Sequence, residues 1–299
     1  MKLSKNALTG YVAVLISAIL FSSKGVVIKL AYLEKIDTLT LLTFRMLFAL
    51  PFFIGTTLYT NYKNKIEPIS KSDIAKLIVL AFLGYYLSPL LDFIGLQYVP
   101  AGIERLILFI YPTIVVILSM IIFKKPITKT MVIALILTYS GLVFVLSFDI
   151  PSQSMDFTFG AILILLCAFT FAIYLVYSEG LIKIHGSTNF TSYIMIVSAI
   201  FFIIHYLIQN QSITALFNYS NKVYLICAIL AFFCTVIPSY LMSYGIKIVG
   251  SGNTAIAGTL GPVWTFFLAS ILLGDKINFY DVIGTILVIS GVLILTLKK

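Results

Sequence analysis

Long apolar segments are the feature that most limits what this chain can fold into. A first apolar run follows Thr9 and reaches about Leu30, and nine further runs follow it, separated by short polar connections. About 20 consecutive apolar residues are enough for a helix to cross the hydrocarbon core of a bilayer. None of the runs alternates in polarity as a transmembrane β-barrel requires. The nine further runs cover approximately residues 39–59, 74–95, 101–123, 129–147, 158–178, 190–208, 222–245, 252–273 and 280–297.

The composition supports an integral membrane protein. Hydrophobic residues make up 61% of the 299 residues. Charged residues make up only 10%, whereas soluble domains usually contain about 25%. The connections between the runs are too short to form a soluble domain. We therefore predict an all-α integral membrane protein with ten transmembrane helices.

The net charge of +9 has two candidate explanations, a nucleic-acid partner or membrane topology. The basic residues lie in short connections beside apolar runs, which indicates topology, so we expect no nucleic-acid partner. If the N-terminus is cytoplasmic, most loop lysines fall on the cytoplasmic side, where Lys and Arg are normally enriched. Only Lys29, Lys35, Lys222 and Lys276 then remain outside. We therefore expect a multi-pass protein of the cell inner (plasma) membrane with both termini cytoplasmic.

The two halves of the chain resemble each other at a constant offset of 150 residues. We expect two repeats, residues 1–149 and 150–299, with five helices each. Because five is an odd number, the second repeat crosses the membrane in the opposite direction to the first. Such five-plus-five inverted repeats recur in secondary transporters, which hold their substrate at the repeat interface. The alternative is a duplication retained for stable packing alone. The matching residues are Gly95 with Gly245, Val99 with Val249, Gly102 with Gly252, and Pro112 with Pro262.

Ionisable residues inside the apolar runs are the first candidates for a functional site. Lys24, Arg45, Asp92, Glu104 and Arg105 lie near the predicted outer ends of four helices. With a helical rise of 1.5 Å per residue, all five fall in one layer roughly 5–10 Å below the outer membrane boundary. Ionisable side chains at such depth are costly, and they usually mark a pathway or a binding site. We call these five residues the charged layer.

Two interpretations of the charged layer are open. Asp92 and Glu104 can form ion pairs with two of the three cations and hold the helices together. Alternatively, the third cation leaves a positively charged cavity that binds a ligand, and the planar fork of Arg suits a carboxylate or a phosphate. Both interpretations hold together if the ion pairs open when the substrate binds.

Three aromatic residues are weaker candidates for the same cavity. Tyr111 lies seven residues after Glu104 and therefore shares its helix face. Tyr85 and Trp264 are further candidates, although aromatic residues in membrane proteins also serve as packing or interface anchors. We expect no metal and no cofactor. The three cysteines lie inside apolar runs without metal-binding spacing, and we interpret them as small core residues: Cys167, Cys227 and Cys234.

The whole chain resembles the EamA-type transporters of the drug/metabolite transporter superfamily. The resemblance rests on the ten runs, the length, the repeat, and the segments YPTIVVILSMIIFKKPIT and GPVWTFFLASILLGDKIN. It implies a basket of helices around a central cavity, and export or exchange of amino acids or other small metabolites. Members commonly carry an acidic residue after the fourth and ninth helices. This chain has Lys125 and Asp275 there, so its first repeat departs from the family pattern.

We therefore predict a secondary transporter that moves a small polar metabolite, amino-acid-like or anionic, by alternating access. It would work as an exporter or an exchanger. The expected partners are the substrate, the lipid bilayer, and a proton or a counter-substrate, and a homodimer is left open. The sequence contains no phosphate-binding loop and no metalloprotease or serine-hydrolase motif, so we predict that the protein is not an enzyme. The alternatives are an uptake carrier for nucleotide-like metabolites, a channel and an intramembrane enzyme.

Overall fold

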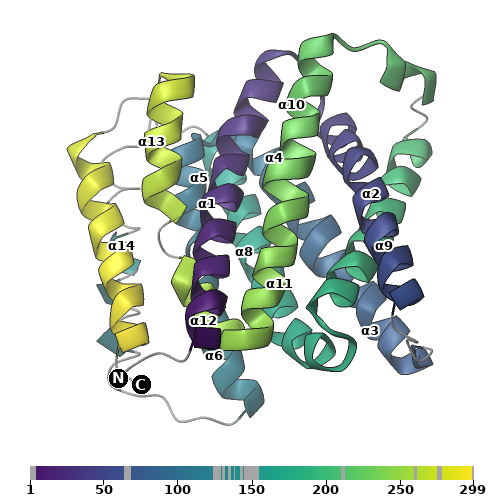
Figure 1. Ribbon diagram of the computed structural model, residues 1–299. Helices are drawn as coiled ribbons and strands as arrows, with labels where there is room; N and C mark the ends of the chain where they lie inside the picture. The colour runs from purple at the N-terminus through teal and green to yellow at the C-terminus, as the bar shows by residue number, and fades with distance from the viewer. Residues whose placement is uncertain are drawn as a thin grey trace.

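Helices make up all the regular secondary structure in the described part of the chain (Figure 1). The computed structural model describes residues 5–63, 69–123, 155–209, 213–258, 261–274 and 278–297, together with isolated residues between 129 and 144. The all-α prediction is therefore confirmed for these ranges. In order, the elements are α1 (Lys5–Leu33), α2 (Thr38–Lys63), α3 (Lys71–Ala81), η1 (Phe82–Leu87), α4 (Ser88–Tyr98), α5 (Ala101–Leu108), α6 (Tyr111–Phe123), α8 (Met155–His185), α9 (Ser187–Ile208), η2 (Ile213–Phe217), α10 (Asn221–Ala231), η3 (Phe232–Val236), α11 (Ile237–Val249), α12 (Ser251–Ala257), α13 (Gly261–Leu273) and α14 (Phe279–Leu297).

Seven helical segments of the described chain are long and apolar enough to cross a membrane, and two shorter apolar helices follow, Trp264–Leu273 and Val282–Gly291. A multi-pass membrane protein is therefore supported. Most of the run predicted at 129–147, the repeat boundary at 149–150, and Lys125 and Asp275 lie outside the described residues. The total of ten spans remains a prediction. The seven segments are Leu8–Leu33, Thr38–Lys63, Lys71–Tyr98, Ala101–Ile122, Met155–His185, Ser187–Ile208 and Asn221–Val249.

Two opposite faces of the bundle are defined by its helix ends. α1 begins and α14 ends at the lower face in Figure 1, which we call the proximal face. The end of α8 lies there beside the start of α3, since His185 Nε2 is 3.3 Å from Asp73 Oδ2. At the opposite, distal face, the end of α1 meets the start of α10 through Glu34 Oε1 and Lys222 Nζ, 2.6 Å apart. The predicted assignment of the proximal face to the cytoplasm remains a prediction.

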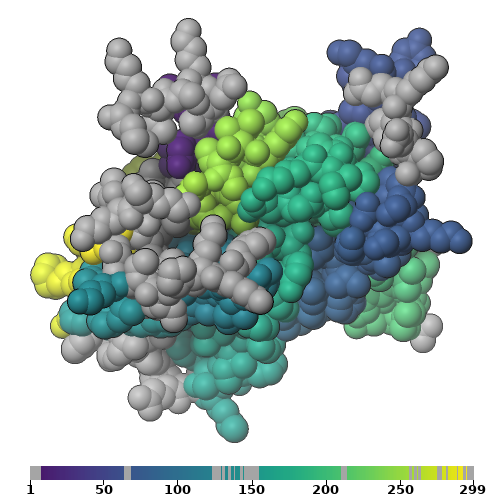
Figure 2. Space-filling model, turned by 90° about the horizontal axis from the view of Figure 1, so that it is seen from below, coloured from purple at the N-terminus to yellow at the C-terminus, as the bar shows by residue number. Residues whose placement is uncertain are grey.

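The proximal face brings together helix ends from both halves of the chain. Seen from below, the surface of the α11–α12 junction lies next to that of the α8–α9 junction (Figure 2). Glu179 near the end of α8 accepts hydrogen bonds from Ser251 N at 3.0 Å and Ser251 Oγ at 2.7 Å. An anionic side chain at a helix N-terminus satisfies backbone donors that the helix leaves unpaired. Glu179 therefore ties α8 to the start of α12.

Helix interruptions recur at an offset of 150 residues, as the predicted repeat requires. The segments η1 and η3 are π-helical turns, which begin at Phe82 and Phe232, and a proline follows each turn, Pro89 in α4 and Pro238 in α11. Ser70 and Ser220, also 150 residues apart, cap α3 and α10 by accepting from Asp73 N and Val223 N. These correspondences favour the predicted repeat. π-Helical turns often lie at functional sites.

The predicted single helices at 101–123 and 252–273 each consist of two helices. A turn at Phe109 and Ile110 separates α5 from α6. Pro112 has no N–H with which to continue the backbone ladder, so a new helix starts around it. In the second half, α12 ends at Ala257 and α13 starts at Gly261. The break places short helix ends inside the bundle, beside the charged layer.

Two close helix crossings depend on glycine. A Cβ atom added to Gly95 of α4 would lie 3.0 Å from the carbonyl oxygen of Gly160 in α8, and one added to Gly160 would lie equally close to the Gly95 oxygen. The crossing of α1 with α11 uses Gly10, whose added Cβ would lie 2.7 Å from Ile248, and Gly245, which contacts Val14. Small residues of this kind let membrane helices approach closely. The two crossings join helices from opposite halves of the chain.

Candidate functional site

A narrow central cavity lies between the two halves of the chain. It has a volume of about 60 Å³, which is space for only a few water molecules. Of the predicted site residues, Lys24, Arg45, Tyr85, Arg105 and Tyr111 line it. The other described lining residues are Ala18, Phe21, Gly84, Ser88, Pro89, Leu108, Cys167, Phe171, Cys234, Thr235, Met242 and Gly258.

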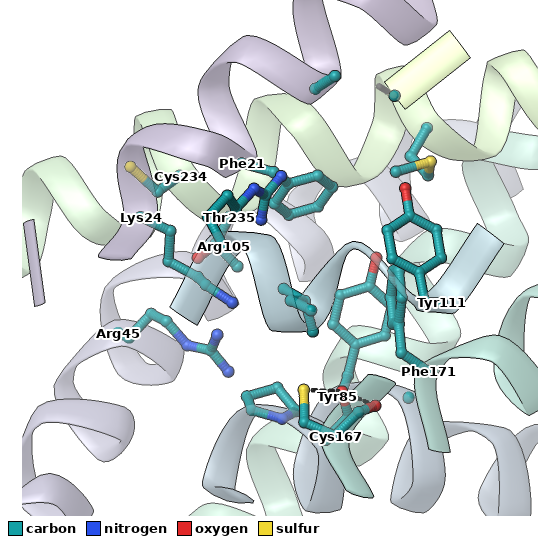
Figure 3. Close-up of a pocket in the computed structure, with 17 residues that line it drawn as sticks. Phe21, Lys24, Arg45, Tyr85, Arg105, Tyr111, Cys167, Phe171, Cys234 and Thr235 are labelled. Atoms are coloured by element: carbon teal, nitrogen blue, oxygen red, sulfur yellow. Dashed lines mark hydrogen bonds between the residues drawn. The ribbon is translucent and has the colours of Figure 1, made fainter. Parts of the chain in front are cut away.

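The cavity has a cationic side and an aromatic side. In the view of Figure 3, Lys24, Arg45 and Arg105 approach from one side, and Tyr85, Tyr111 and Phe171 from the other. The rings of Tyr111 and Phe171 contact each other edge to face, with centroids 5.4 Å apart. Tyr174 extends the row, since its ring centroid is 5.2 Å from that of Tyr85. Such contacts fix the positions of the rings across the cavity from the cations.

Lys24 of α1 forms an ion pair with Asp92 of α4. Its Nζ atom is 2.5 Å from Asp92 Oδ2, and the Asp92 side chain is completely buried. This is one of the ion pairs that the first interpretation of the charged layer predicts. The charge of Lys24 is therefore largely neutralised inside the protein. Asp92 Oδ1 has no hydrogen-bond partner among the residues that the structure describes.

Arg45 of α2 has no carboxylate partner within ion-pair distance in the described ranges. Its side chain is buried, with 3% exposure. The guanidinium lies 5.3 Å from the ring centroid of Phe93 and 5.8 Å from that of Phe202. These aromatic faces stabilise the charge only in part. The Nε and Nη2 donors of Arg45 find no acceptor on any described residue.

Arg105 is held on the adjacent helix α5. Its Nη2 atom donates to Ser22 Oγ at 2.8 Å, which fixes the side chain against α1. Gly261 at the start of α13 lies beside the guanidinium, and a Cβ atom there would be 3.1 Å from Arg105 Nη2. The Nε atom of Arg105 is again without an acceptor in the described part of the chain. Arg105 thus presents a spare donor next to the cavity.

Glu104 and Asp92 are not among the described residues that line the cavity. The Glu104 carboxyl group lies in the electrostatic neighbourhood of Asp92, Lys24 and Arg105. It packs against Gly25 of α1, where an added Cβ atom would lie 2.9 Å from Glu104 Oε2. Two buried carboxyl groups this close repel each other when both are ionised, and a proton on one of them relieves the repulsion.

Trp264 also lies outside the described cavity lining. Its indole Nε1 donates to Ser23 Oγ at 2.9 Å, and the neighbouring Thr265 Oγ1 donates to the Ser22 carbonyl oxygen at 2.9 Å. Trp264 and Thr265 therefore attach α13 to the segment of α1 that carries Lys24. This geometry indicates that Trp264 positions α1.

Several lining residues escaped the sequence reasoning because they are small or apolar. Cys234 and Thr235 in η3 are examples, and Ser88 contacts Cys167 with an Oγ–Sγ distance of 3.1 Å. The offset of 150 residues would have identified some of them, since Gly84 and Tyr85 correspond to Cys234 and Thr235. All three cysteines are buried free thiols. In the described ranges, no group of three or more His, Cys, Asp or Glu residues is arranged to hold a metal ion.

Comparisons with known proteins agree with this architecture. The sequence profile of the EamA-like transporter family matches residues 8–147 and 158–297. The uncharacterized transporter YcbK of Bacillus subtilis (strain 168) is 30% identical over 283 residues, which cover 94% of this chain and 90% of that protein. An uncharacterized transporter of Archaeoglobus fulgidus is 24% identical over 268 residues, covering 89% of this chain and 90% of that protein.

A solved crystal structure has the same fold. It superposes with a TM-score of 0.72 at 15% sequence identity and covers 99% of this chain and 98% of that chain. The similarity in fold and the two matches to the family profile together extend over nearly the full length of the sequence. The chain belongs to the EamA-like transporter family.

Proposed function

We propose that the protein is a secondary transporter for a small metabolite with a carboxylate or phosphate group, such as an amino acid. The family and its relatives support a membrane transporter rather than an enzyme. In this proposal the substrate binds in the central cavity, and the protein moves it across the membrane by alternating access, as export or exchange.

One observation carries the proposal, the two unpaired donors of Arg45. A buried donor without an acceptor costs about 1–3 kcal/mol, and more when it is charged. A carboxylate or phosphate in the cavity would accept from Nε and Nη2 together, because the guanidinium fork matches the geometry of these anions. Lys24 is already paired with Asp92, so Arg45 and Arg105 supply the charge that attracts the ligand.

The opposite wall of the cavity suits the less polar part of such a substrate. Tyr85, Tyr111 and Phe171 offer ring surfaces, and the Tyr85 hydroxyl has no hydrogen-bond partner on a described residue. A cavity of about 60 Å³ is too small for a metabolite, so the helices must separate to admit one. This need for movement favours a carrier over a channel, whose pore must be continuous for conduction.

Thermal unfolding of the purified protein with single metabolites tests the proposal. A ligand that binds only the folded state raises the melting temperature. We expect amino acids or other carboxylates to raise the melting temperature of the wild type and to leave that of Arg45→Gln unchanged. Lys183→Gln is the matched control, since Lys183 is an exposed cation at the proximal face, paired with Glu179. An anion that stabilises Arg45→Gln as much as the wild type would overturn the proposal.

A further inference from the structure

A second pocket opens at the distal face, where α1 ends and α2 begins. It has a volume of about 460 Å³, and its polar lining consists of Lys29, Tyr32, Lys35, Asp37 and Gln97. Asp37 Oδ1 accepts a hydrogen bond from Thr40 N at 2.9 Å and so caps α2. Lys35 adds a cation to the lining of the same pocket. We call this pocket the vestibule.

The vestibule lies outward of the charged layer on three helices. Tyr32 is eight residues beyond Lys24 on α1, which is about 12 Å of helix. Thr38 precedes Arg45 on α2 by seven residues, or about 10 Å. On α4, Gln97 follows Asp92 by five residues, or about 7 Å.

A hydrogen-bond network closes the floor of the vestibule. The Tyr32 hydroxyl donates to the Phe93 carbonyl oxygen at 2.6 Å and lies 2.9 Å from Thr38 Oγ1. Gln97 Nε2 donates to the same Thr38 oxygen at 2.5 Å. Because Tyr32 has one proton to donate, Thr38 donates to Tyr32 while it accepts from Gln97. The network joins α1, α2 and α4 to one another.

Phe93 connects this network to the cavity. Its carbonyl oxygen is the acceptor for Tyr32, and its ring lies 6.0 Å from Lys24 Nζ and 5.3 Å from the Arg45 guanidinium. Both cations line the central cavity. Loss of the Tyr32 bond would therefore remove the tie between the distal end of α1 and the residue of α4 whose ring contacts both cations, while the Lys24–Asp92 pair still joins the two helices deeper in the bundle.

We propose that the vestibule is the distal opening of the transport pathway for an anionic metabolite and that Tyr32 is its gate. The proposal rests on the function proposed for the central cavity. Lys35 attracts the anion from solution, and the bond from Tyr32 to Phe93 separates the anion from Arg45. When that bond breaks, the ends of α1 and α2 move apart from α4 and the two pockets become continuous.

The cysteines of the cavity report whether the gate is open. Cys167 and Cys234 line the cavity, and Cys227→Ala removes the third thiol, which lies elsewhere in α10. In the Cys227→Ala protein we measure the rate at which a membrane-impermeant maleimide alkylates the two cavity cysteines, with Tyr32 present and with Tyr32→Phe. The measurement is made on vesicles of each orientation. We expect Tyr32→Phe to raise the alkylation rate about fivefold, which is the effect of losing one typical hydrogen bond. The increase should occur only when the reagent reaches the distal face.

Tyr224→Phe is the matched control. Tyr224 also donates its hydroxyl to a backbone carbonyl at the distal face, that of Leu216 at 2.8 Å, but it does not line the vestibule. We expect the unmodified rate for this variant. Equal alkylation rates for Tyr32→Phe and Tyr224→Phe would contradict the proposal that Tyr32 is the gate. A faster alkylation by reagent at the proximal face would contradict it as well. If Tyr32→Phe does not fold, Thr38→Val breaks the same network and must raise the rate in its place.

The charge of the reagent tests the anion preference of the vestibule. In the Tyr32→Phe background, an anionic thiol reagent should react faster than a cationic one, and Lys35→Gln should reduce this difference. Added salt should reduce it as well, because it screens exposed charges. A cationic reagent that reacts as fast as the anionic one would exclude the vestibule as an anion pathway. Alkylation needs no substrate, so a negative result here is separate from a failure of the proposed transport function.

Discussion

Lys24 and Arg45 lie in the same layer but depend on different partners. Lys24 has a carboxylate at 2.5 Å, whereas Arg45 has only two aromatic faces. A buried ion pair contributes little by itself, but removal of one partner leaves an uncompensated charge. We therefore expect Lys24 to have mainly a structural role, whereas Arg45 remains the cation that we propose for ligand binding.

Removing the carboxylate of Asp92 should destabilise the protein. We expect Asp92→Asn to lower the free energy of unfolding by about 3 kcal/mol, since Lys24 would stay buried without its partner. The double variant Lys24→Met with Asp92→Asn should regain part of this loss, because it removes both charges. Melting temperatures of both single variants and the double variant in detergent measure the coupling. Additive losses would contradict the ion pair.

Glu104 is the residue with which we expect a proton to be coupled to transport. Its carboxyl group lies near that of Asp92 and near Lys24 and Arg105, so a proton on it alters the charge balance of the layer. We expect Glu104→Gln to abolish the response of transport in proteoliposomes to an imposed pH gradient while substrate exchange continues. Glu34→Gln is the control, since Glu34 pairs with Lys222 at the distal face. A wild-type protein that ignores the gradient would exclude proton coupling.

The sequence reveals the charged part of the site but not all of its wall. Lys24, Arg45 and Arg105 stand out because ionisable residues are rare in apolar runs. Phe171 and Cys234 look like ordinary packing residues in the sequence. They line the cavity only because of the way in which the two halves of the chain pack together. Trp264 stands out in the sequence as well, yet its indole binds Ser23 of α1.

At the scale of helices, hydropathy predicts where the chain crosses the membrane but not where helices change geometry. The predicted starts at 74 and 222 lie close to the observed starts of α3 and α10, which Ser70 and Ser220 cap. The π-helical turns at 82–87 and 232–236 depend on backbone hydrogen bonds and tertiary packing, which leave no trace in an apolar run. Pro112 does mark the break between α5 and α6 in the sequence.

The crossing of α4 with α8 gives a prediction at this scale. We expect Gly95→Ala to destabilise the protein by about 1–3 kcal/mol, because the added methyl group would press on the Gly160 backbone. Gly180→Ala is the matched control in α8, since nothing lies within 4 Å of the added atom. That change should be neutral or stabilising by up to about 1 kcal/mol. Equal melting temperatures for the two variants would contradict the close crossing.

At the scale of the whole molecule, the two halves of the chain interlock. α1 packs against α11, α2 against α9, and α4 against α8, and each pair takes one helix from each half. The predicted repeats are therefore divisions of the sequence whose helices share one packed interior. We expect transport to move groups of helices drawn from both halves, with α1 and α2 separating from α4 at the vestibule.

The orientation of the molecule in the membrane is directly testable. Asn218 is exposed at the distal face after η2, and Lys183 is exposed near the proximal end of α8. We expect an impermeant thiol reagent added to whole cells to label Asn218→Cys and to leave Lys183→Cys unlabelled. The excess of lysine on the proximal side is the reason. The reverse pattern of labelling would place the N-terminus outside.

The small volume of the central cavity also has an electrical consequence. The few water molecules that a cavity of about 60 Å³ can hold do not form a continuous aqueous thread across a hydrocarbon layer about 30 Å thick. We therefore expect this conformation to conduct no ions. We then expect a membrane to hold many copies of the protein without losing its voltage, with each copy passing charge only as fast as its helices rearrange.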